Sequence, residues 1–352
     1  MLERYANILK QLREESESSS QFNINSRVLI IDSTNSFIRC FSVIPAQNDD
    51  GEHIGGSLGF LRSIGAAIRQ FKPTRVIAVF DGKGGSVKRK KIYAGYKANR
   101  MNPKSFNRPE LFNSTEHEQE SMVHQFGRLI QYLRCLPITT IVMDHVEADD
   151  VIAYAVTDYF SKKSDQIIVM SDDKDYLQLI NDKVNVWRPV EKKLYTQESV
   201  EERFKVSAQN YLLYKVFIGD TSDGIPGVNG IGEKTIINKL PILKERRALE
   251  IDELTTYCKE SYDSKLKLIV EQNDIVRRNY ALMQLHDVDI SASNKMLIID
   301  RLTEEVLPIN KTQFKQMLTL DSGTSYIKDA DFWLTTFNSL SAYSFQSKDL
   351  RS

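Results

Sequence analysis

Four short apolar segments, each as long as a β-strand and each ending at an aspartate or directly before one, constrain the fold most strongly. They are residues 27–32, 75–81, 138–144 and 167–171. Segments with helical periodicity follow or separate them, at 58–70, 118–135, 149–160 and 175–181. Near-continuous apolar strands that alternate with helices are typical of a parallel sheet covered on both faces. The pattern therefore predicts an α/β fold with a central, mostly parallel sheet flanked by helices.

The composition excludes several other classes of protein. The 352 residues are 41% hydrophobic and 27% charged, with 47 basic and 47 acidic side chains, which is ordinary globular usage. No apolar run approaches 18 residues and the charged N-terminus does not resemble a signal peptide, so we expect a cytoplasmic protein and no membrane partner. The cysteines Cys40, Cys135 and Cys258 are too scattered for a thiolate zinc site.

Acidic residues follow each of the predicted strands. Asp32 and Asp81 close the first two, and further acids follow the third and fourth strands, namely Glu147, Asp149, Asp150, Asp172, Asp173 and Asp175. A single aspartate after a strand is usually a helix cap or a turn residue. Four successive strands of an open α/β sheet, however, carry their acids to one edge, where the charges repel each other. Carboxylates without His or Cys favour Mg²⁺ or Mn²⁺ over zinc, so this edge is a predicted magnesium site.

A second acidic segment lies further along the chain and runs into a glycine-rich turn. Asp220 and Asp223 share one face of a turn or helix, directly before the sequence 224–235, GIPGVNGIGEKT. Glycines allow close backbone approach, and the N–H groups at a helix start can hold a phosphate. A plain glycine-rich turn is the alternative. The position behind the acids favours a DNA-backbone clamp made of Gly227, Gly230, Gly232, Lys234 and Thr235.

Residues 82–109 contain nine lysines and arginines and no acid. Tyrosines and a phenylalanine are interleaved with them, which suits a surface that follows phosphates and stacks bases. A solvated loop is the alternative. Because the segment starts beside Asp81, its cations are predicted to lie next to the carboxylates. An acidic site that binds a polyanion needs such cations, which here include Lys88, Arg89, Lys97 and Arg100, with Tyr96 among the interleaved aromatic residues.

Together these motifs resemble the 5′-nuclease family, which includes flap endonucleases, the 5′→3′ exonuclease domain of bacterial DNA polymerase I and free-standing phage ribonuclease H/5′-exonucleases. The resemblance covers residues 27–240 in order and spacing. The chain is most similar to the free-standing phage branch, because it has no polymerase domain. The motifs that carry it are RVLIID (27–32), AVFDG (78–82), YAGYKANR (93–100), VEADDVIA (146–153), SDDKDYLQLI (171–180) and GDTSDGIPGVNGIGEKT (219–235).

The resemblance implies two metal sites and a PIN-like core with two appended DNA-binding parts. It assigns Asp32, Asp81, Glu147 and Asp149, with Asp150 adjacent, to the first Mg²⁺, and Asp173, Asp175, Asp220 and Asp223 to the second. Mn²⁺ could substitute. Lys97 and Arg100 are expected near the scissile phosphate, and Asp81 and Asp149 to take part in catalysis. In the run Asp172-Asp173-Lys174-Asp175 the register is ambiguous, and Asp173 is favoured because it keeps the D-x-D spacing.

The predicted division of the chain is an N-terminal helix and linker (1–22), an α/β core (23–215) and a helix–three-turn–helix region (216–300). The resemblance implies a K⁺ ion bound at the helix–three-turn–helix. A helical arch (86–125) is inserted in the core, and a helical extension (301–352) follows. We expect a monomeric, structure-dependent 5′→3′ exonuclease or flap endonuclease that hydrolyses 5′ ends of DNA or RNA on duplex DNA by a two-metal-ion mechanism. It would act in the host cytoplasm if phage-encoded.

Two other functions stay open at this point. A PIN-type ribonuclease acting on single strands would share the acidic sheet edge, but such domains usually lack the motif at 219–235. A non-catalytic DNA-binding module would use the glycine-rich turn alone. The aromatic residues Phe332, Trp333 and Phe337 could dock a single-strand-binding protein or a sliding clamp, although a packed terminal helix explains them as well.

Overall fold

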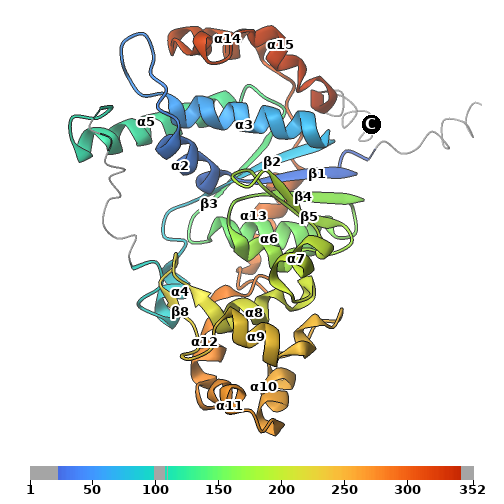
Figure 1. Cartoon of the computed structure of the whole chain (residues 1–352). Coiled ribbons are helices and arrows are strands. Elements are labelled where there is room, and N and C mark those ends of the chain that lie inside the picture. Colours follow the sequence, from blue (N-terminus) through green and yellow to red (C-terminus); the bar gives the residue numbers. More distant parts are fainter. Residues whose placement is uncertain (1–22, 99–107, 109, 342–352) are drawn as a thin grey trace, which may run out of the picture.

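The computed structural model describes residues 23–98, 108 and 110–341. Its centre is a six-stranded sheet in the order β3-β2-β1-β4-β5-β6, in which all neighbouring strands are parallel except β5 and β6 (Figure 1). The strands are β1 (Arg27–Asp32), β2 (Arg75–Asp81), β3 (Thr139–Met143), β4 (Gln166–Met170), β5 (Val184–Arg188) and β6 (Lys193–Tyr195). The predicted fold class, an α/β fold with a mostly parallel sheet, is confirmed.

Helices cover both faces of the sheet, as the alternation within β1 requires. Leu29 and Ile31 pack into the cluster of apolar side chains that includes helices α2 (Ser33–Val43), α3 (Gly55–Phe71) and α5 (Thr115–Leu133). Val28 and Ile30 point to the other cluster, with α6 (Ala148–Tyr154), its π-helical continuation η2 (Ala155–Phe160) and α8 (Tyr211–Ile218). Period-two alternation on a buried strand therefore supplies both layers.

The predicted strands at 27–32 and 75–81 match the structure, and those at 138–144 and 167–171 differ from β3 and β4 by one residue at each end. The structure adds elements that the periodicity did not indicate: α2, the strands β5 and β6 at one side of the sheet, and the short basic helix α4 (Val87–Ile92). The predicted helix at 1–13 lies outside the described residues. The three cysteines are buried and form no disulfide.

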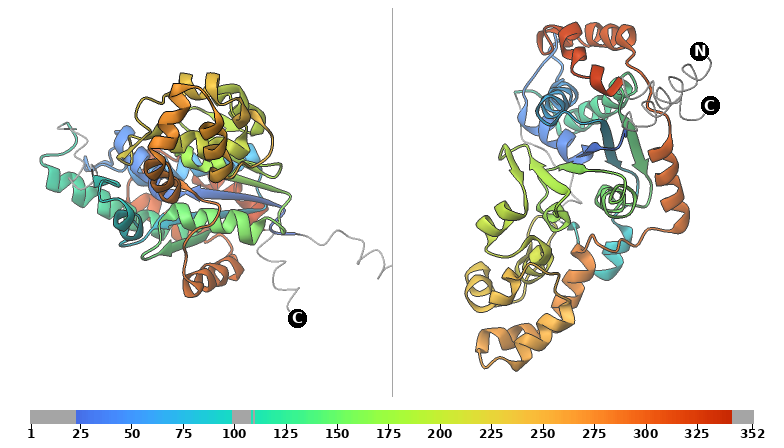
Figure 2. Two further views of the ribbon diagram at one scale, coloured as in Figure 1. Left: turned by 90° about the horizontal axis from the view of Figure 1, so that it is seen from below. Right: turned by 90° about the vertical axis from the view of Figure 1, so that its right-hand side faces the viewer.

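A mostly helical part follows the sheet, as predicted. Figures 1 and 2 show the helices from α9 to α12 extending away from the sheet beyond α8. A two-stranded hairpin of β7 (Gly219–Asp220) and β8 (Ile225–Pro226) follows α8 directly. Three further elements precede α8, namely η3 (Lys174–Leu179), α7 (Gln197–Phe204) and η4 (Ala208–Asn210). The elements after the hairpin are α9 (Glu233–Lys239), η5 (Pro241–Lys244), α10 (Ile251–Glu260), α11 (Ser264–Glu271), α12 (Asn273–Met283), α13 (Ala292–Thr303), α14 (Lys311–Leu320), η6 (Gly323–Ser325) and α15 (Ala330–Thr335).

The C-terminal helices return to the sheet. Helix α13 packs against β3, and the carbonyl of Leu302 accepts a hydrogen bond of 2.6 Å from Arg75. Helices α14 and α15 lie over α3 and α5 (Figure 1), where the Trp333 and Phe314 rings stack at 5.2 Å. Trp333 and Phe337 are buried, so the packed-helix interpretation of the C-terminal aromatic residues is confirmed for these two. The predicted division at residues 215 and 300 stays a prediction.

In the described part of the chain no helix is both long and apolar enough to cross a bilayer.

Candidate active site

The carboxyl ends of the parallel strands meet at one edge of the sheet, and acids extend from four of them. In the strand register, Ile31 lies opposite Met170 and Asp32 opposite Val79, while Asp81 lies opposite Met143. Side chains that directly follow these positions therefore lie at the same level. The predicted acids are spread over about 200 positions of the sequence, and the fold brings them together here.

Four of these acids, which we call the inner carboxylates, have no basic partner within ion-pair distance among the described residues: Asp32, Asp81, Asp149 and Asp173. Each is oriented by neutral donors instead. Asp32, which is 4% exposed, accepts from the Ser171 hydroxyl at 2.8 Å, and Asp81 accepts from the Ala148 N–H at 2.8 Å. Asp149 accepts from the Tyr176 hydroxyl at 2.9 Å, and Asp173 accepts from the Asp175 N–H at 2.9 Å.

Burial and the charges of neighbouring carboxylates raise the pKa values of Asp32, Asp81 and Asp173, and Asp149 contributes in all three cases. Burial, followed by the charges of Asp149 and Asp81, raises the pKa of Asp32 to about 7. Burial and then Asp175 and Asp149 hold the pKa of Asp173 well above its usual value. Solvent reaches Asp81, but surrounding protein atoms and Asp149 raise its pKa as well. Such repulsion in a poorly solvated site identifies four charges within mutual reach.

A second set, the outer carboxylates, comprises Glu147, Asp150, Asp175 and Asp220, and each of them is ion-paired. Glu147 receives Lys97 Nζ at 2.6 Å and the Arg89 guanidinium, while Arg89 also contacts Asp150 at 2.6 Å. Burial alone would raise the pKa of Glu147, but the charges of Lys97 and Arg89 lower it overall. These pairs attach α4 and the segment after it to the start of α6.

Lys215 forms the corresponding link on the other side of the site. Its Nζ lies 2.8 Å from Asp175 and 2.5 Å from Asp220, and the residue is only 8% exposed. Although burial opposes it, this contact lowers the pKa of Asp220 to about 2. The sequence analysis missed Lys215. The available signal was one lysine in the otherwise apolar helix YLLYKVFI, because a buried lysine requires a carboxylate partner.

The structure separates the two candidates for the D-x-D register. Asp172 turns away from the inner carboxylates, with its carboxylate 3.2 Å from Arg39 and accepting from the Val190 N–H at 3.0 Å. Asp173 and Asp175 remain at the site, because Asp173 caps the 3₁₀-helix η3. The choice of Asp173 as the metal ligand of this run stays a prediction.

Asp223 connects the acidic turn to the basic segment. It is buried, and its carbonyl accepts from the Lys97 N–H at 2.8 Å. Lys97 itself has a positive φ of 50°. Tyr96 is 2% exposed and donates to Glu147 at 3.1 Å, so in this arrangement its ring faces protein. Lys88 lies on α4 and contacts Asp289 at 2.9 Å, and Arg100 lies outside the described residues.

The glycine-rich turn is fixed from behind by two amide side chains. Asn279 donates to the carbonyls of Val216 and Pro226, at 3.0 and 2.9 Å. Gln272 accepts from the Asn229 N–H and donates to its carbonyl. A Cβ on Gly227 would lie 2.3 Å from the Ile218 carbonyl oxygen, so only glycine fits there.

The same turn ends at the start of helix α9. Gly230 has a φ of 80°, and Gly232 precedes the first residue of the helix. Lys234 is exposed and Thr235 half-buried in its first turn, and the Thr235 N–H donates to the Gly232 carbonyl at 2.9 Å. Gly232, Lys234 and Thr235 of the predicted clamp therefore lie at the start of this helix, while Gly227 lies earlier, directly after β8. The phosphate contacts and the K⁺ ion stay predictions.

The donor set fits a divalent metal ion, although the side chains are not arranged around one. No three Asp, Glu, His or Cys side chains among the described residues form a group that could hold a single ion as they stand. The inner carboxylates nevertheless supply hard oxygen ligands whose mutual repulsion a divalent cation would relieve. The metal assignments stay a prediction that this chemistry supports.

Comparison with known proteins places these features in a family. Residues 27–205 match the family profile described as "5'-3' exonuclease, N-terminal resolvase-like domain". The chain is 30% identical over 262 residues to a 5'-3' exonuclease of Aquifex aeolicus, covering 74% of this chain and 82% of that protein. It is 32% identical over 221 residues to a 5'-3' exonuclease of Bacillus subtilis, covering 60% of this chain and 68% of that one.

Two further proteins are similar to this chain, one in sequence and one in fold. A thermostable DNA polymerase I of Thermus thermophilus is 30% identical over 254 residues, which are 71% of this chain but 28% of the polymerase. The bacteriophage T5 D15 flap endonuclease, solved as a pseudo-enzyme-product complex with DNA and metal ions, superposes with a TM-score of 0.59 at 20% identity. That alignment covers 84% of this chain and 99% of the phage protein and shows a shared fold. The family profile matches half of this chain, and the chain is 30% identical to a 5'-3' exonuclease of which it covers 82%. The chain therefore belongs to the 5′-3′ exonuclease family of nucleases.

Proposed function

We propose that the protein is a divalent-metal-dependent nuclease that cleaves phosphodiesters at 5′ ends and flaps on duplex DNA. The observation that carries this proposal is the group of four inner carboxylates, which lie within mutual electrostatic reach and without basic partners at the carboxyl edge of the sheet. The T5 flap endonuclease with the same fold was crystallised with DNA and metal ions. Family membership supports the 5′→3′ direction.

The carboxylates would hold two metal ions. Asp32, Asp81 and Asp149 would bind the first, with Glu147 and Asp150 beside them, and Asp173, Asp175, Asp220 and Asp223 would bind the second. When bound, such ions neutralise the carboxylates, activate water and stabilise the leaving oxygen. Mg²⁺ is the cation that we propose, because the ligands are carboxylates alone.

The basic side chains have two tasks that follow from their positions. Lys97 is bound to Glu147 and lies next to the inner carboxylates, so its ammonium can attract a phosphodiester to a site that would otherwise repel it. Once the substrate provides negative charge, Lys97 can stabilise the charge that develops on the reacting phosphate. Arg100 is proposed to act with it.

The glycine-rich turn would bind the duplex away from the cleavage point. Its exposed helix start offers N–H groups and Lys234 to a phosphate, and Asn279 and Gln272 hold its geometry. Lys215 and the Lys97–Asp223 hydrogen bond join this turn to the carboxylates. We infer that binding to duplex and cleavage at the 5′ end occur on one rigid unit, which supports structure dependence.

One assay tests this function. A 5′-labelled flap substrate and a nicked duplex are incubated with the protein in Mg²⁺, Mn²⁺ or EDTA, and products are resolved by length. We expect metal-dependent release of short 5′ products or flaps and no cleavage in EDTA. Equal cleavage of single-stranded RNA without a duplex would favour the PIN-type ribonuclease. Binding without cleavage in either metal would favour the non-catalytic module and refute the proposal.

A further inference from the structure

A basic cavity of about 890 Å³ lies between α3 and the segment 325–333 that leads into α15. Helix α3 runs toward the amino ends of the strands, since β2 begins at Arg75, shortly after Phe71. None of the described residues that line the cavity belongs to the inner or outer carboxylates. The residues that argue for a ligand are Arg62 and Arg69 of α3, with Tyr326, Lys328 and Phe332 on the opposite wall.

The three cations of this cavity are exposed and form no ion pair with any described residue. Arg62 stacks over the Tyr326 ring at 5.5 Å, and Arg69 donates only to the Thr336 hydroxyl at 3.3 Å. The one acid in the lining, Asp329, caps α15 by accepting from the Phe332 N–H at 2.9 Å. The wall thus presents an excess of positive charge with no partner on the described part of the chain.

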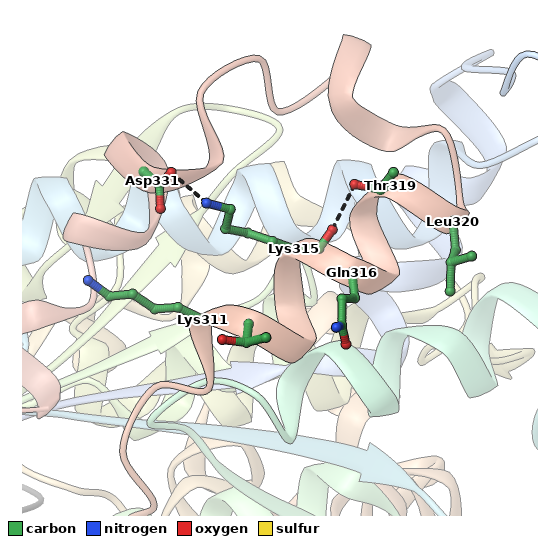
Figure 3. Close-up of a pocket in the computed structure, with 7 residues that line it drawn as sticks. Lys311, Lys315, Gln316, Thr319, Leu320 and Asp331 are labelled. Carbon is green, nitrogen blue, oxygen red and sulfur yellow. Dashed lines mark hydrogen bonds and ion pairs between the residues drawn. The ribbon is translucent and has the colours of Figure 1, made fainter.

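The neighbouring groove on α14 shows the contrasting case. There Lys315 lies 2.7 Å from Asp331, so its charge is already matched, as Figure 3 shows for the side chains of that groove. Next to the unmatched cations of the basic cavity, the Phe332 ring is 70% exposed. Unpaired arginines beside an exposed ring suit a short acidic segment whose carboxylates pair with the guanidinium groups.

The chain itself contains such a segment within reach. Residues 14–20 read EESESSS and hold three glutamates, which equals the number of unpaired cations. The described chain starts at Asn23, and the carbonyl of Ile24 accepts from Thr74 at 2.7 Å, five residues after Arg69. Glu17 precedes Asn23 by six residues, a span of about 20 Å when extended.

We propose that residues 14–20 bind in the basic cavity, with Glu14, Glu15 and Glu17 paired to its three cations. This contact joins the N-terminal segment to the C-terminal helices across α3 and covers the Phe332 ring. It involves no residue of the proposed active site. Nuclease activity is therefore an independent control, and failure of this proposal leaves the proposed function untouched.

Disulfide trapping in the full-length protein tests the proposal, because the three natural cysteines are buried. The pair Ser16→Cys with Ser325→Cys places one thiol in the acidic segment and one at the cavity. The matched control joins Ser16→Cys to Leu320→Cys, an exposed position in the α14 groove. In a glutathione redox buffer we expect an intrachain disulfide in the cavity pair. The effective concentration of its two thiols should be about tenfold higher than that of the control pair.

Charge reversal then separates docking from random collision. Lys328→Glu, alone and together with Arg62→Glu, is expected to reduce the cavity-pair disulfide about tenfold, and adding Glu14→Lys and Glu15→Lys is expected to restore it. Lys328→Glu alone covers the case in which Arg62→Glu disturbs the Tyr326 contact. Equal trapping of both pairs, insensitivity to charge, or disulfides only between two chains would overturn the proposal. A partner's acidic segment would then be the alternative occupant.

Discussion

The inner and outer carboxylates lie at the same sheet edge but are stabilised in opposite ways. The outer ones have cations within 3 Å and link α4, α6 and the hairpin β7–β8 to one another. The inner ones have only neutral donors and repel each other. The difference separates acids whose charge a lysine or arginine of the protein already balances from acids whose charge only a bound cation could balance. Each prediction below tests one side of that division.

The largest effect is expected for an inner carboxylate. Asp81→Asn or Asp173→Asn should slow cleavage at least about 10²-fold, because each removes a proposed ligand of the metal ions that would stabilise charge at the reacting phosphate. DNA binding should persist. Single-turnover cleavage of the flap substrate and a binding isotherm measure the two quantities.

The matched control is Asp172→Asn, since this neighbouring acid faces Arg39. It should retain nearly full activity. If Asp172→Asn abolished cleavage while Asp173→Asn did not, the assigned register would be wrong. Near-normal Mg²⁺-dependent cleavage by both Asp81→Asn and Asp173→Asn would refute the metal assignment.

A smaller loss of rate is expected when the cation of the outer set is removed. Lys97→Ala should slow cleavage about 10-fold to 10²-fold and weaken binding much less, because its charge acts on the developing charge of the phosphate. Lys91→Ala, on the exposed face of α4, is the control for a general loss of positive charge. A Lys97→Ala effect confined to Kd would count against a role at the scissile phosphate.

Neutralising an outer carboxylate should lower the free energy of unfolding, whereas neutralising an inner one should raise it. Glu147→Gln leaves Lys97 without its partner and weakens the Arg89 contact in a buried site, which should lower the free energy of unfolding by about 2 kcal/mol. Asp173→Asn should raise it in EDTA, because repulsion is removed. Urea unfolding measures both.

The exposed pair of Arg247 and Glu253 is the control for Glu147→Gln. Glu253→Gln should leave the unfolding midpoint unchanged, because exposed ion pairs contribute little. Destabilisation by Asp173→Asn in EDTA would contradict the division into inner and outer sets.

The pH dependence of stability should have opposite signs at Asp32 of the inner set and Asp220 of the outer set. The pKa of Asp32 is raised from 3.8 to about 7, so the folded state binds this proton more tightly and stability falls as pH rises from about 4 to about 7. Asp32→Asn should remove this fall, gaining about 2 kcal/mol relative to wild type between pH 5 and pH 8 in EDTA. Urea midpoints at these pH values measure the change; a constant difference would argue against the repulsion.

Asp220 carries the opposite sign. Its pKa is lowered to about 2, so the stability that Lys215 provides is present above about pH 4 and is lost as pH falls through 2. An Asp220→Asn variant should therefore lose stability at neutral pH relative to wild type, and this loss should shrink in acid.

The smallest effect is expected outside both sets. Lys234→Ala should weaken duplex binding a few-fold and reduce the slope of log K against log salt by about one, because one phosphate contact is lost. The cleavage rate at saturating substrate should not change. Fluorescence anisotropy at several salt concentrations measures the slope, and an unchanged slope would remove Lys234 from the interface.

Much of this site could be predicted from the sequence, because its positions follow from strand ends. A β-branched run such as 27–32 has few other conformations available, and an acid after a parallel strand must lie at the carboxyl edge. The division into inner and outer sets could not be predicted. It depends on which lysine or arginine reaches which acid, and Arg89 and Lys215 come from separate elements.

Helix α2 shows a second limit. Its sequence, STNSFIRCFSV, is rich in residues with modest helix propensity. Asp32 also ends strand β1, so the helix starts directly after a strand with no loop between them. The structure holds it by the Asp32 cap and by the burial of Phe37 and Phe41. The Asp32 cap is local, but the burial of Phe37 and Phe41 is a tertiary contact, which no local pattern contains. The short strands β5 and β6 are stabilised in the same way, at the edge of a sheet that already exists.

The backbone hydrogen bond between Lys97 and Asp223, together with the Lys215 bridge, has a geometric consequence. These contacts fix the distance between the carboxylates and the turn that we propose binds duplex DNA. Under the proposed function, that distance would determine how far from the duplex contact a strand is cut. Because Asp220 and Asp223 lie within the same hairpin, lengthening it between Gly219 and Gly227 would move two proposed metal ligands together with the duplex contact.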